Sequence, residues 1–195
     1  MELTGQQTLS LPIDRVWAAL NDPAILQQCI PGCDVFEETG ANHYKIVMTA
    51  TVGPIRAKFT GKLLLSDITP PSSYKLGFDG SGGAAGSGKG TAAVQLSTVP
   101  EGTLLRYTAS ATVAGRLAQV GSRLIDGVAK KMADQFFARF KSILEPEAPG
   151  EAEDAEATPI SAGRPAVARS GGRLKWAAAA AAIVAIALGL YLAFN

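Results

Sequence analysis

Apolar and polar residues alternate along several segments of the first 113 residues. Every second residue from Tyr44 to Val52 is apolar, and the alternation resumes from Ile55 to Asp67 after a Gly53-Pro54 turn. A period of two places the apolar side chains on one face of a β-strand. A mixed pattern predicts a first strand over residues 2–11, and further strands are expected over residues 34–38, 73–81, 86–99 and 103–113. Most of these segments are neighbours in sequence, so we expect about seven antiparallel strands in one sheet.

Helical patterns precede and follow this run of strands. Asp14 can cap a short helix through Leu20, and a second short helix is expected over residues 24–29. Spacings of three and four predict a long helix over residues 116–144. Its apolar stripe comprises Leu117, Val120, Gly121, Leu124, Val128, Met132, Phe136, Phe140 and Ile143. Only this helix is large enough to cover the apolar face of the sheet. The predicted fold is therefore α+β of the helix-grip type, a curved antiparallel sheet wrapped on a long C-terminal helix.

The composition changes after residue 144, which divides the chain into three parts. Residues 145–160 hold six acidic residues and no basic ones, whereas residues 161–175 hold four basic residues and no acidic ones. Proline, glycine, alanine and glutamate without periodicity predict a disordered linker over residues 145–175. Residues 176–194 carry no charge and, as a helix, would span roughly 28 Å, about one hydrocarbon core. We expect a folded domain over residues 1–144, this linker, and one C-terminal transmembrane anchor over residues 176–194.

The charge distribution gives the anchor an orientation. The four basic residues lie before it, so the positive-inside rule places the folded domain in the cytoplasm, at the inner membrane. The first residues lack the basic and apolar regions of a signal peptide. Nine alanines make the segment only moderately apolar, and a buried helix of a soluble core is the alternative. The formal net charge of +1 offers no basic field for nucleic acid, and we expect no such partner.

Residues that commonly carry catalysis or bind metals are few. Cys29 and Cys33 with the single His43 fall short of a zinc-ligand set, so two reduced thiols are expected and no metal. Residues 83–90 resemble a phosphate-binding loop, but Gly90 stands where Ser or Thr is needed, and a strand pattern follows where a helix is needed. We expect no catalytic residues. An enzyme remains the alternative, with His43 and Asp34 as its candidates.

Small residues at positions expected to face the helix suggest a cavity. These residues are Ala50, Ala57, Gly61, Gly80, Ala92, Ala109 and Ala111. Side chains this short cannot by themselves fill the space between sheet and helix. Either the helix lies close to the sheet over a thin filled core, or an apolar cavity remains for a hydrophobic ligand. The expected lining is Met48, Phe59, Phe78, Tyr107, Ala109, Leu117, Gly121, Leu124 and Val128.

Several of these segments carry a family resemblance. Residues 13–23 and Cys29-Ile30-Pro31-Gly32-Cys33 are similar to the opening of the SRPBCC (START-like) superfamily. Ile30-Pro31-Gly32-Cys33, Val52-Gly53-Pro54-Ile55 and residues 115–124 resemble the G-subunit family of carbon monoxide dehydrogenase. The resemblance covers residues 1 to about 144. It implies a helix-grip fold with a hydrophobic cavity and an accessory role beside a molybdenum-flavin dehydrogenase of the carbon monoxide dehydrogenase type.

The resemblance also implies how the parts work together. Members of this family are thought to bring such dehydrogenases to the membrane, where electrons enter the quinone pool. We expect a bound quinone or isoprenoid lipid and no covalent cofactor. Arg116 and Arg123 are expected to face the partner, although both are equally consistent with solvated helix charges. Gly115 and Gly121 are expected to let sheet and helix approach closely. A pure recruitment or assembly factor with no ligand is the main alternative.

Overall fold

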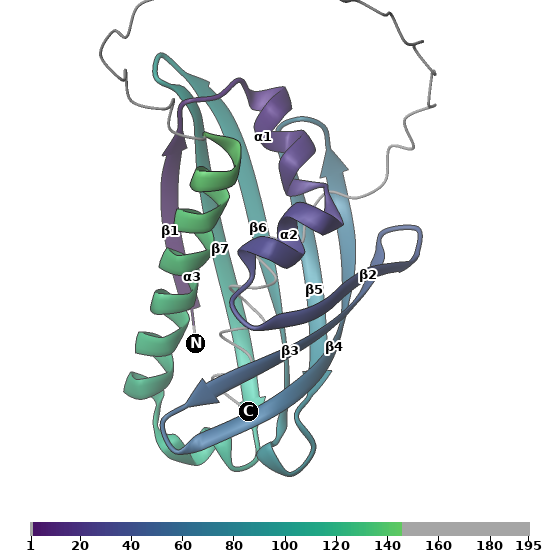
Figure 1. Ribbon diagram of the computed structural model, residues 1–195, viewed down its shortest axis with the longest axis vertical. Coiled ribbons are helices and arrows are strands. Elements are labelled where there is room, and N and C mark those ends of the chain that lie inside the picture. Colours follow the sequence, from purple (N-terminus) through teal and green to yellow (C-terminus); the bar gives the residue numbers. More distant parts are fainter. Residues whose placement is uncertain (1, 146–195) are drawn as a thin grey trace, which may run out of the picture.

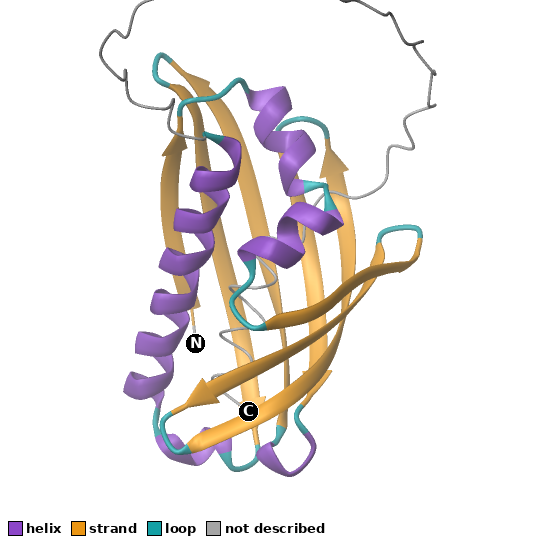
Figure 2. Cartoon of the chain, viewed as in Figure 1, coloured by secondary structure: helices purple, strands orange, loops and turns teal. Residues whose placement is uncertain are grey.

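The structure, a computed structural model, describes residues 2–145. Seven strands form one antiparallel sheet in the order β1-β7-β6-β5-β4-β3-β2 (Figure 1). The strands are β1 (Glu2–Leu9), β2 (Cys33–Gly40), β3 (His43–Val52), β4 (Ile55–Thr69), β5 (Ser73–Ser81), β6 (Ser87–Val99) and β7 (Gly102–Ala114). The sheet curves strongly, and its concave face receives all three α-helices (Figure 2). The helix-grip architecture expected from the sequence is thus confirmed for the described residues.

Two short helices, α1 (Ile13–Leu20) and α2 (Pro23–Cys29), connect β1 to β2. Asp22 caps α2, since its carboxylate accepts hydrogen bonds from the backbone N–H groups of Ala24 at 2.8 Å and Ile25 at 3.4 Å. The expected cap of α1 is wrong. Pro12 occupies the N-cap position of that helix, and Asp14 lies inside its first turn.

The alternation that predicted β3 corresponds directly to burial. Tyr44, Ile46, Met48, Ala50 and Val52 are all buried on the concave face. The two-residue turn between β3 and β4 contains Gly53 at a φ of +55°, a backbone conformation that favours glycine. Register then places Met48 opposite Phe59 and Ala50 opposite Ala57. The sequence pattern therefore located both the turn and the inward face of this hairpin.

The long helix begins later than the sequence pattern indicated. A 3-10 turn, η2 (Leu117–Val120), comes first, and α3 covers Ser122–Leu144. Gly121 separates them with a φ of +92°, which no α-helical residue adopts. Leu117 and Val120 keep the helical spacing of apolar residues although they lie before the break, so the pattern alone did not reveal it. Within α3 the buried residues are Ile125, Ala129, Met132, Ala133, Phe136, Phe137 and Phe140.

The inward face of α3 is consequently rotated from the expected stripe. Met132, Phe136 and Phe140 are buried as expected, but Leu124 and Ile143 are 42% and 37% exposed. No helix in residues 2–145 is long and apolar enough to cross a membrane. The predicted anchor at residues 176–194, and the predicted linker apart from Glu145, lie outside the described residues.

Candidate functional site

The concave face carries a patch of short side chains across β4 to β7. We call it the small-residue region; it comprises Gly61, Gly80, Gly88, Gly90, Ala92, Ala109 and Ala111. Strand register aligns its members in rows, because Ala92 pairs with Ala109, Gly90 pairs with Ala111, and Gly80 pairs with both Gly61 and Gly88. The sequence-based inference that small residues gather on one inward surface is thereby confirmed.

Aromatic rings cover glycines at three places around the sheet. A Cβ atom on Gly90 would lie 2.3 Å from Cζ of Phe78, and one on Gly82 would lie 2.1 Å from Cε1 of Phe59. A Cβ on Gly5 of β1 would likewise lie 2.3 Å from the hydroxyl oxygen of Tyr107. These rings occupy space that the missing side chains would otherwise fill. At these three glycines the space beside the backbone is therefore filled by aromatic rings.

The other end of the interior is packed with aromatic side chains. We call it the aromatic region; it comprises Trp17, Tyr74, Tyr107, Phe136, Phe137 and Phe140. Phe137 stacks on Tyr107 with ring centroids 5.5 Å apart, and Phe136 lies 5.2 Å from Phe137 and 5.6 Å from Phe140. All six residues are buried. The C-terminal half of α3 is held to the sheet by this cluster.

The residues expected to line a cavity divide into two groups. Met48, Phe59, Phe78, Tyr107, Ala109 and Leu117 are buried in one core. Val128 is only partly buried, while Gly121 and Leu124 are exposed. Leu124 lies against the β3–β4 turn, since a Cβ on Gly53 would be 2.9 Å from its Cδ2 atom. The structure thus brings six of the nine together, and their role as a ligand lining stays a prediction.

Several residues face the interior although the sequence pattern did not place them there. Ile125 and Ala129 take the inward positions on α3 that Leu124 and Val128 were expected to occupy. Tyr74 and Trp17 meet edge to face, with centroids 5.7 Å apart. Both tyrosine and tryptophan stood within recognised elements, but only the fold places α1 over β5. The available signal was the apolar spacing around them. Leu76 lies two residues after Tyr74 on its strand, and Ile13 lies four residues before Trp17 on its helix.

Polar groups are scarce in this interior. The hydroxyl of Thr103 is satisfied, since it donates to the carbonyl of Leu11 at 2.6 Å. Burial raises the pKa of Tyr74 above its ordinary range, and burial with the nearby Asp134 carboxylate raises the pKa of Tyr107. Both phenols are therefore neutral near pH 7. An interior of this kind suits a ligand that is mostly hydrocarbon.

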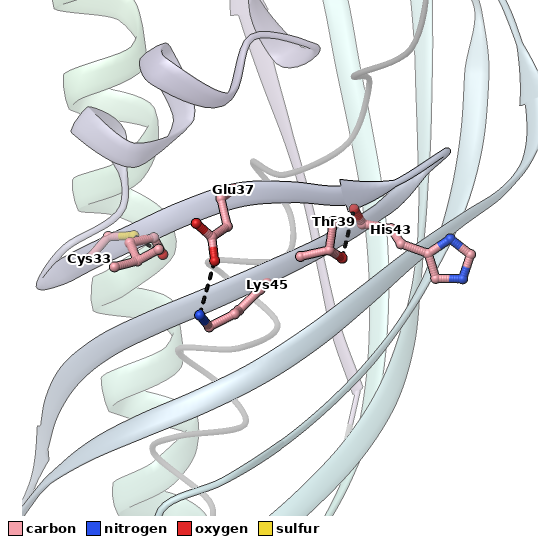
Figure 3. Close-up of polar contacts among 6 residues, drawn as sticks. Cys33, Glu37, Thr39, His43 and Lys45 are labelled. Atoms are coloured by element: carbon pink, nitrogen blue, oxygen red, sulfur yellow. Dashed lines mark hydrogen bonds and ion pairs between the residues drawn. The ribbon is translucent and has the colours of Figure 1, made fainter.

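The cysteines and the histidine do not form a reactive centre. Burial raises the pKa of Cys29 and of Cys33 to about 12, so both thiols are protonated near neutral pH. His43 is exposed, with its Nδ1 atom 2.8 Å from the carbonyl oxygen of Ala41. Figure 3 shows Cys33 and His43 at opposite ends of the β2–β3 hairpin, with the Glu37–Lys45 ion pair of 2.9 Å between them. Within residues 2–145 no group of three or more potential metal ligands occurs.

The residues proposed for an alternative catalytic site are also separated. Asp34 lies at the beginning of β2, where its carboxylate pairs with Lys58 at 3.1 Å. His43 begins β3 and pairs in register with Gly40 at the far end of β2. Asp34 is exposed and ion-paired rather than desolvated. This geometry does not bring His43 and Asp34 together as an acid–base pair.

Arg116 and Arg123 flank the break before α3. Both are exposed, and in the described part of the chain neither forms an ion pair. Arg123 lies in the first turn of α3, which holds no acidic residue. A cation there opposes the helix dipole, so its position does not stabilise the helix.

The glycines beside these arginines act differently from expectation. A Cβ on Gly115 would lie 2.6 Å from the Cα of Gly86, so this residue allows the end of β7 to approach the β5–β6 connection rather than the helix. A Cβ on Gly121 would meet nothing within 4 Å. Gly121 is needed for its backbone conformation and not for close approach. The expected sheet–helix role of both glycines is therefore wrong.

The segment resembling a phosphate-binding loop, residues 83–90, covers most of that β5–β6 connection and the beginning of β6. Residues Gly83–Ala85 make the short 3-10 turn η1, and Ser87 begins a thirteen-residue strand. A phosphate-binding loop needs a helix N-terminus at this point. The expectation that the segment leads into a strand is confirmed.

The outer, convex face of the sheet carries an open groove of about 660 Å³ that the sequence did not predict. Gly77 lies in it, and Leu64, its register partner on β4, is 45% exposed. The groove is also lined by His43, Lys62, Asp79, Lys89, Thr91, Ser110 and Thr112. These side chains are polar or charged. Leu63, Phe78, Gly90 and Ala111 complete the lining, so the groove combines apolar and polar residues.

Comparison with known proteins agrees with this architecture. Residues 5–145 match the family described as CoxG, the G-subunit of carbon monoxide dehydrogenase. A conserved protein from Geobacillus kaustophilus has 32% identity and a TM-score of 0.70, with 74% of this chain and 95% of that protein covered. Among curated proteins no relative was found.

More distant structures share the fold alone. A protein from Rhizobium leguminosarum has 17% identity and a TM-score of 0.58, covering 75% of this chain and 95% of that one. Protein Ms6760 from Mycobacterium smegmatis has 16% identity and a TM-score of 0.56, covering 75% and 92%. The family match extends over almost every described residue, from β1 to the end of α3. The chain belongs to the CoxG family, the G-subunit family of carbon monoxide dehydrogenase.

Proposed function

We propose that this protein is a membrane-anchored accessory protein of a molybdenum hydroxylase of the carbon monoxide dehydrogenase type. It recruits the enzyme to the cytoplasmic membrane and binds a quinone or a similar isoprenoid lipid. The family match over residues 5–145 carries the proposal, because it covers the folded domain. The apolar interior supports the ligand, and the uncharged residues 176–194 support the anchor.

The ligand class follows from the chemistry of the interior. A quinone with an isoprenoid tail exposes a large apolar surface, and its transfer through water is costly. The concave face offers buried apolar side chains and short residues such as Ala92, Ala109 and Ala111. A ligand held there is shielded from water while the protein moves between membrane and enzyme.

The predicted linker explains how one protein can reach both the membrane and the enzyme. A flexible chain of 31 residues, the length of the predicted linker over residues 145–175, has a typical reach of roughly 30 Å. This keeps the folded domain at high local concentration near the bilayer, while it stays free to turn toward the enzyme. Arg116 and Arg123 are exposed at one end of the fold and serve as the proposed contacts with the enzyme. A positive charge in the first turn of α3 does not stabilise the helix. Contact with the enzyme gives Arg123 a role that helix stability does not.

The first experiment is native mass spectrometry of the full chain purified in lipid nanodiscs, followed by organic extraction. We expect a co-purifying quinone or isoprenoid lipid. An empty protein that also takes up no added quinone would favour the alternative, a recruitment or assembly factor without a ligand. Enzyme recruitment is measured in parallel by co-sedimentation with membranes.

A pair of substitutions separates the two roles. Ala109 lies on the concave face and Ala93 lies on the outer face, in neighbouring strands. Ala109→Phe is expected to abolish quinone binding and electron transfer to the quinone pool, because the ring takes the ligand's space, while recruitment persists. Ala93→Phe is the matched control and should change neither. Intact electron transfer in the Ala109→Phe protein would contradict the ligand role.

A further inference from the structure

Tyr74 is enclosed between the sheet and α1. It is the second residue of β5, and its side chain is buried on the same face as those of Leu76 and Phe78. Its ring meets Trp17 of α1 edge to face, at 5.7 Å between centroids and an interplanar angle of 67°. Only 1% of the residue is exposed. The phenol therefore points into the interior and has no access to bulk water.

The hydroxyl of Tyr74 has an unused hydrogen-bonding capacity. Among the buried side-chain nitrogen and oxygen atoms of residues 2–145, it is the one without a hydrogen-bond partner. The buried hydroxyl of Thr103, in contrast, donates to a backbone carbonyl. A buried polar group without a partner destabilises a fold, and native proteins rarely retain one unless it has a use.

Two alanines lie near Tyr74 in the strand register. Tyr74 pairs in register with Val94, and the next inward-facing row along the strands contains Leu76, Ala92 and Ala109. Diagonal neighbours two residues apart are within reach of an aromatic side chain. A donor without a partner thus lies one row away from two side chains that end at Cβ, those of Ala92 and Ala109. This is an arrangement that selects an apolar molecule with a hydrogen-bond acceptor.

We propose that the Tyr74 hydroxyl donates a hydrogen bond to a ring carbonyl oxygen of the ligand held in this interior. The inference rests on the proposed function and adds a selectivity determinant to it. Tyr74 distinguishes a quinone from a hydrocarbon of the same shape, because only the quinone supplies an acceptor. It also fixes the ring beneath α1, with the isoprenoid tail directed along the small-residue region.

The test compares two small probes with matched shape. Menadione has a naphthoquinone ring with two carbonyl groups, and methylnaphthalene is the corresponding hydrocarbon. Binding to the full chain in nanodiscs is measured by equilibrium dialysis for the wild type and for Tyr74→Phe. We expect Tyr74→Phe to weaken menadione binding about tenfold, the effect of one neutral hydrogen bond, and to leave methylnaphthalene binding unchanged.

A second readout needs no ligand. Tyr74→Phe removes an unpaired buried hydroxyl, so the melting temperature of the ligand-free protein should rise. Tyr44→Phe is the matched control: Tyr44 is also buried, its ring lies 5.4 Å from Phe36, and its replacement should leave the ratio of the two affinities unchanged.

Two outcomes overturn the proposal in distinguishable ways. Equal menadione affinity in the wild type and Tyr74→Phe, with binding intact, would show that the hydroxyl does not contact the ligand. The proposed carrier function would survive that result. Failure of the wild type to bind either probe, or any added quinone, would overturn both the carrier function and the role of Tyr74.

Discussion

The two ends of the interior differ in how they fill the space between sheet and helix. In the aromatic region, Phe136, Phe137 and Phe140 of α3 interlock with one another, and Phe137 stacks on Tyr107 of β7. In the small-residue region the strands contribute glycine and alanine, and the beginning of α3 contributes Ile125 and Ala129. One curved sheet thus has a densely filled half and a half with short side chains.

This difference separates stability from ligand capacity. Close-packed aromatic side chains bury large apolar areas and define a single arrangement of α3 on the sheet. Short side chains bury less area and stabilise less, and under the proposed function they form the surface that contacts the ligand. In the proposed carrier role, α3 stays anchored at its C-terminal half while the tail of the ligand lies beneath its N-terminal half.

The largest expected effect concerns Phe136, which is fully buried at the centre of the aromatic region. Replacing it by alanine removes a ring that contacts two other phenylalanines and leaves a cavity. We expect Phe136→Ala to lower the free energy of unfolding by about 3–5 kcal/mol, measured by urea titration. Ile143→Ala is the control on the same helix. Because Ile143 is 37% exposed, its replacement should cost less than about 1 kcal/mol. Similar costs for both variants would mean that the aromatic region does not hold α3.

A glycine pair tests how tightly the small-residue region is packed where rings cover it. A Cβ on Gly90 would lie 2.3 Å from both the Ser110 carbonyl oxygen and Cζ of Phe78. Gly90→Ala should therefore destabilise the protein by about 2 kcal/mol, because the strand must shift. A Cβ on Gly77 would meet nothing within 4 Å, so Gly77→Ala should stabilise by about 0.5–1 kcal/mol. Thermal and urea unfolding measure both. An unchanged free energy of unfolding for Gly90→Ala would show that the strands can shift to accept a Cβ atom there. It would also weaken the contrast between the small-residue region and the aromatic region.

The sequence predicted those features that repeat locally. The period-two pattern from Tyr44 to Val52 identified a strand and its inward face, because burial on one side of a sheet imposes that pattern. The beginning of α3 was missed, since Leu117 and Val120 keep a helical spacing inside a 3-10 turn that Gly121 ends. The break between η2 and α3 depends on the φ angle of Gly121, and the spacing of apolar residues contains no information about that angle.

The candidate site was predictable only in its composition. Small residues at alternate positions indicated a patch on the concave face, but which glycines lie under rings depends on strand register, as for Gly90 beneath Phe78. Tyr74 looked like any other inward residue of its strand. Its unpaired hydroxyl is a property of the space beneath α1, which forms only when Trp17 packs on β5.

The smallest expected effect uses Cys29 as a probe of closure at the aromatic end. Burial raises the pKa of this thiol from 9.0 to about 12, and the Arg139 guanidinium of α3 partly opposes the shift. The folded state therefore keeps a proton that the unfolded state releases above pH 9, so stability falls as pH rises from 9 toward 12. At pH 10 this linkage amounts to about 1 kcal/mol. The free energy of unfolding should therefore fall less between pH 8 and pH 10 in Cys29→Ala than in the wild type. The difference between the two proteins should be about 1 kcal/mol. An unchanged pH dependence would mean that water reaches the thiol between α2 and α3, and that the aromatic end is less closed than its packing implies.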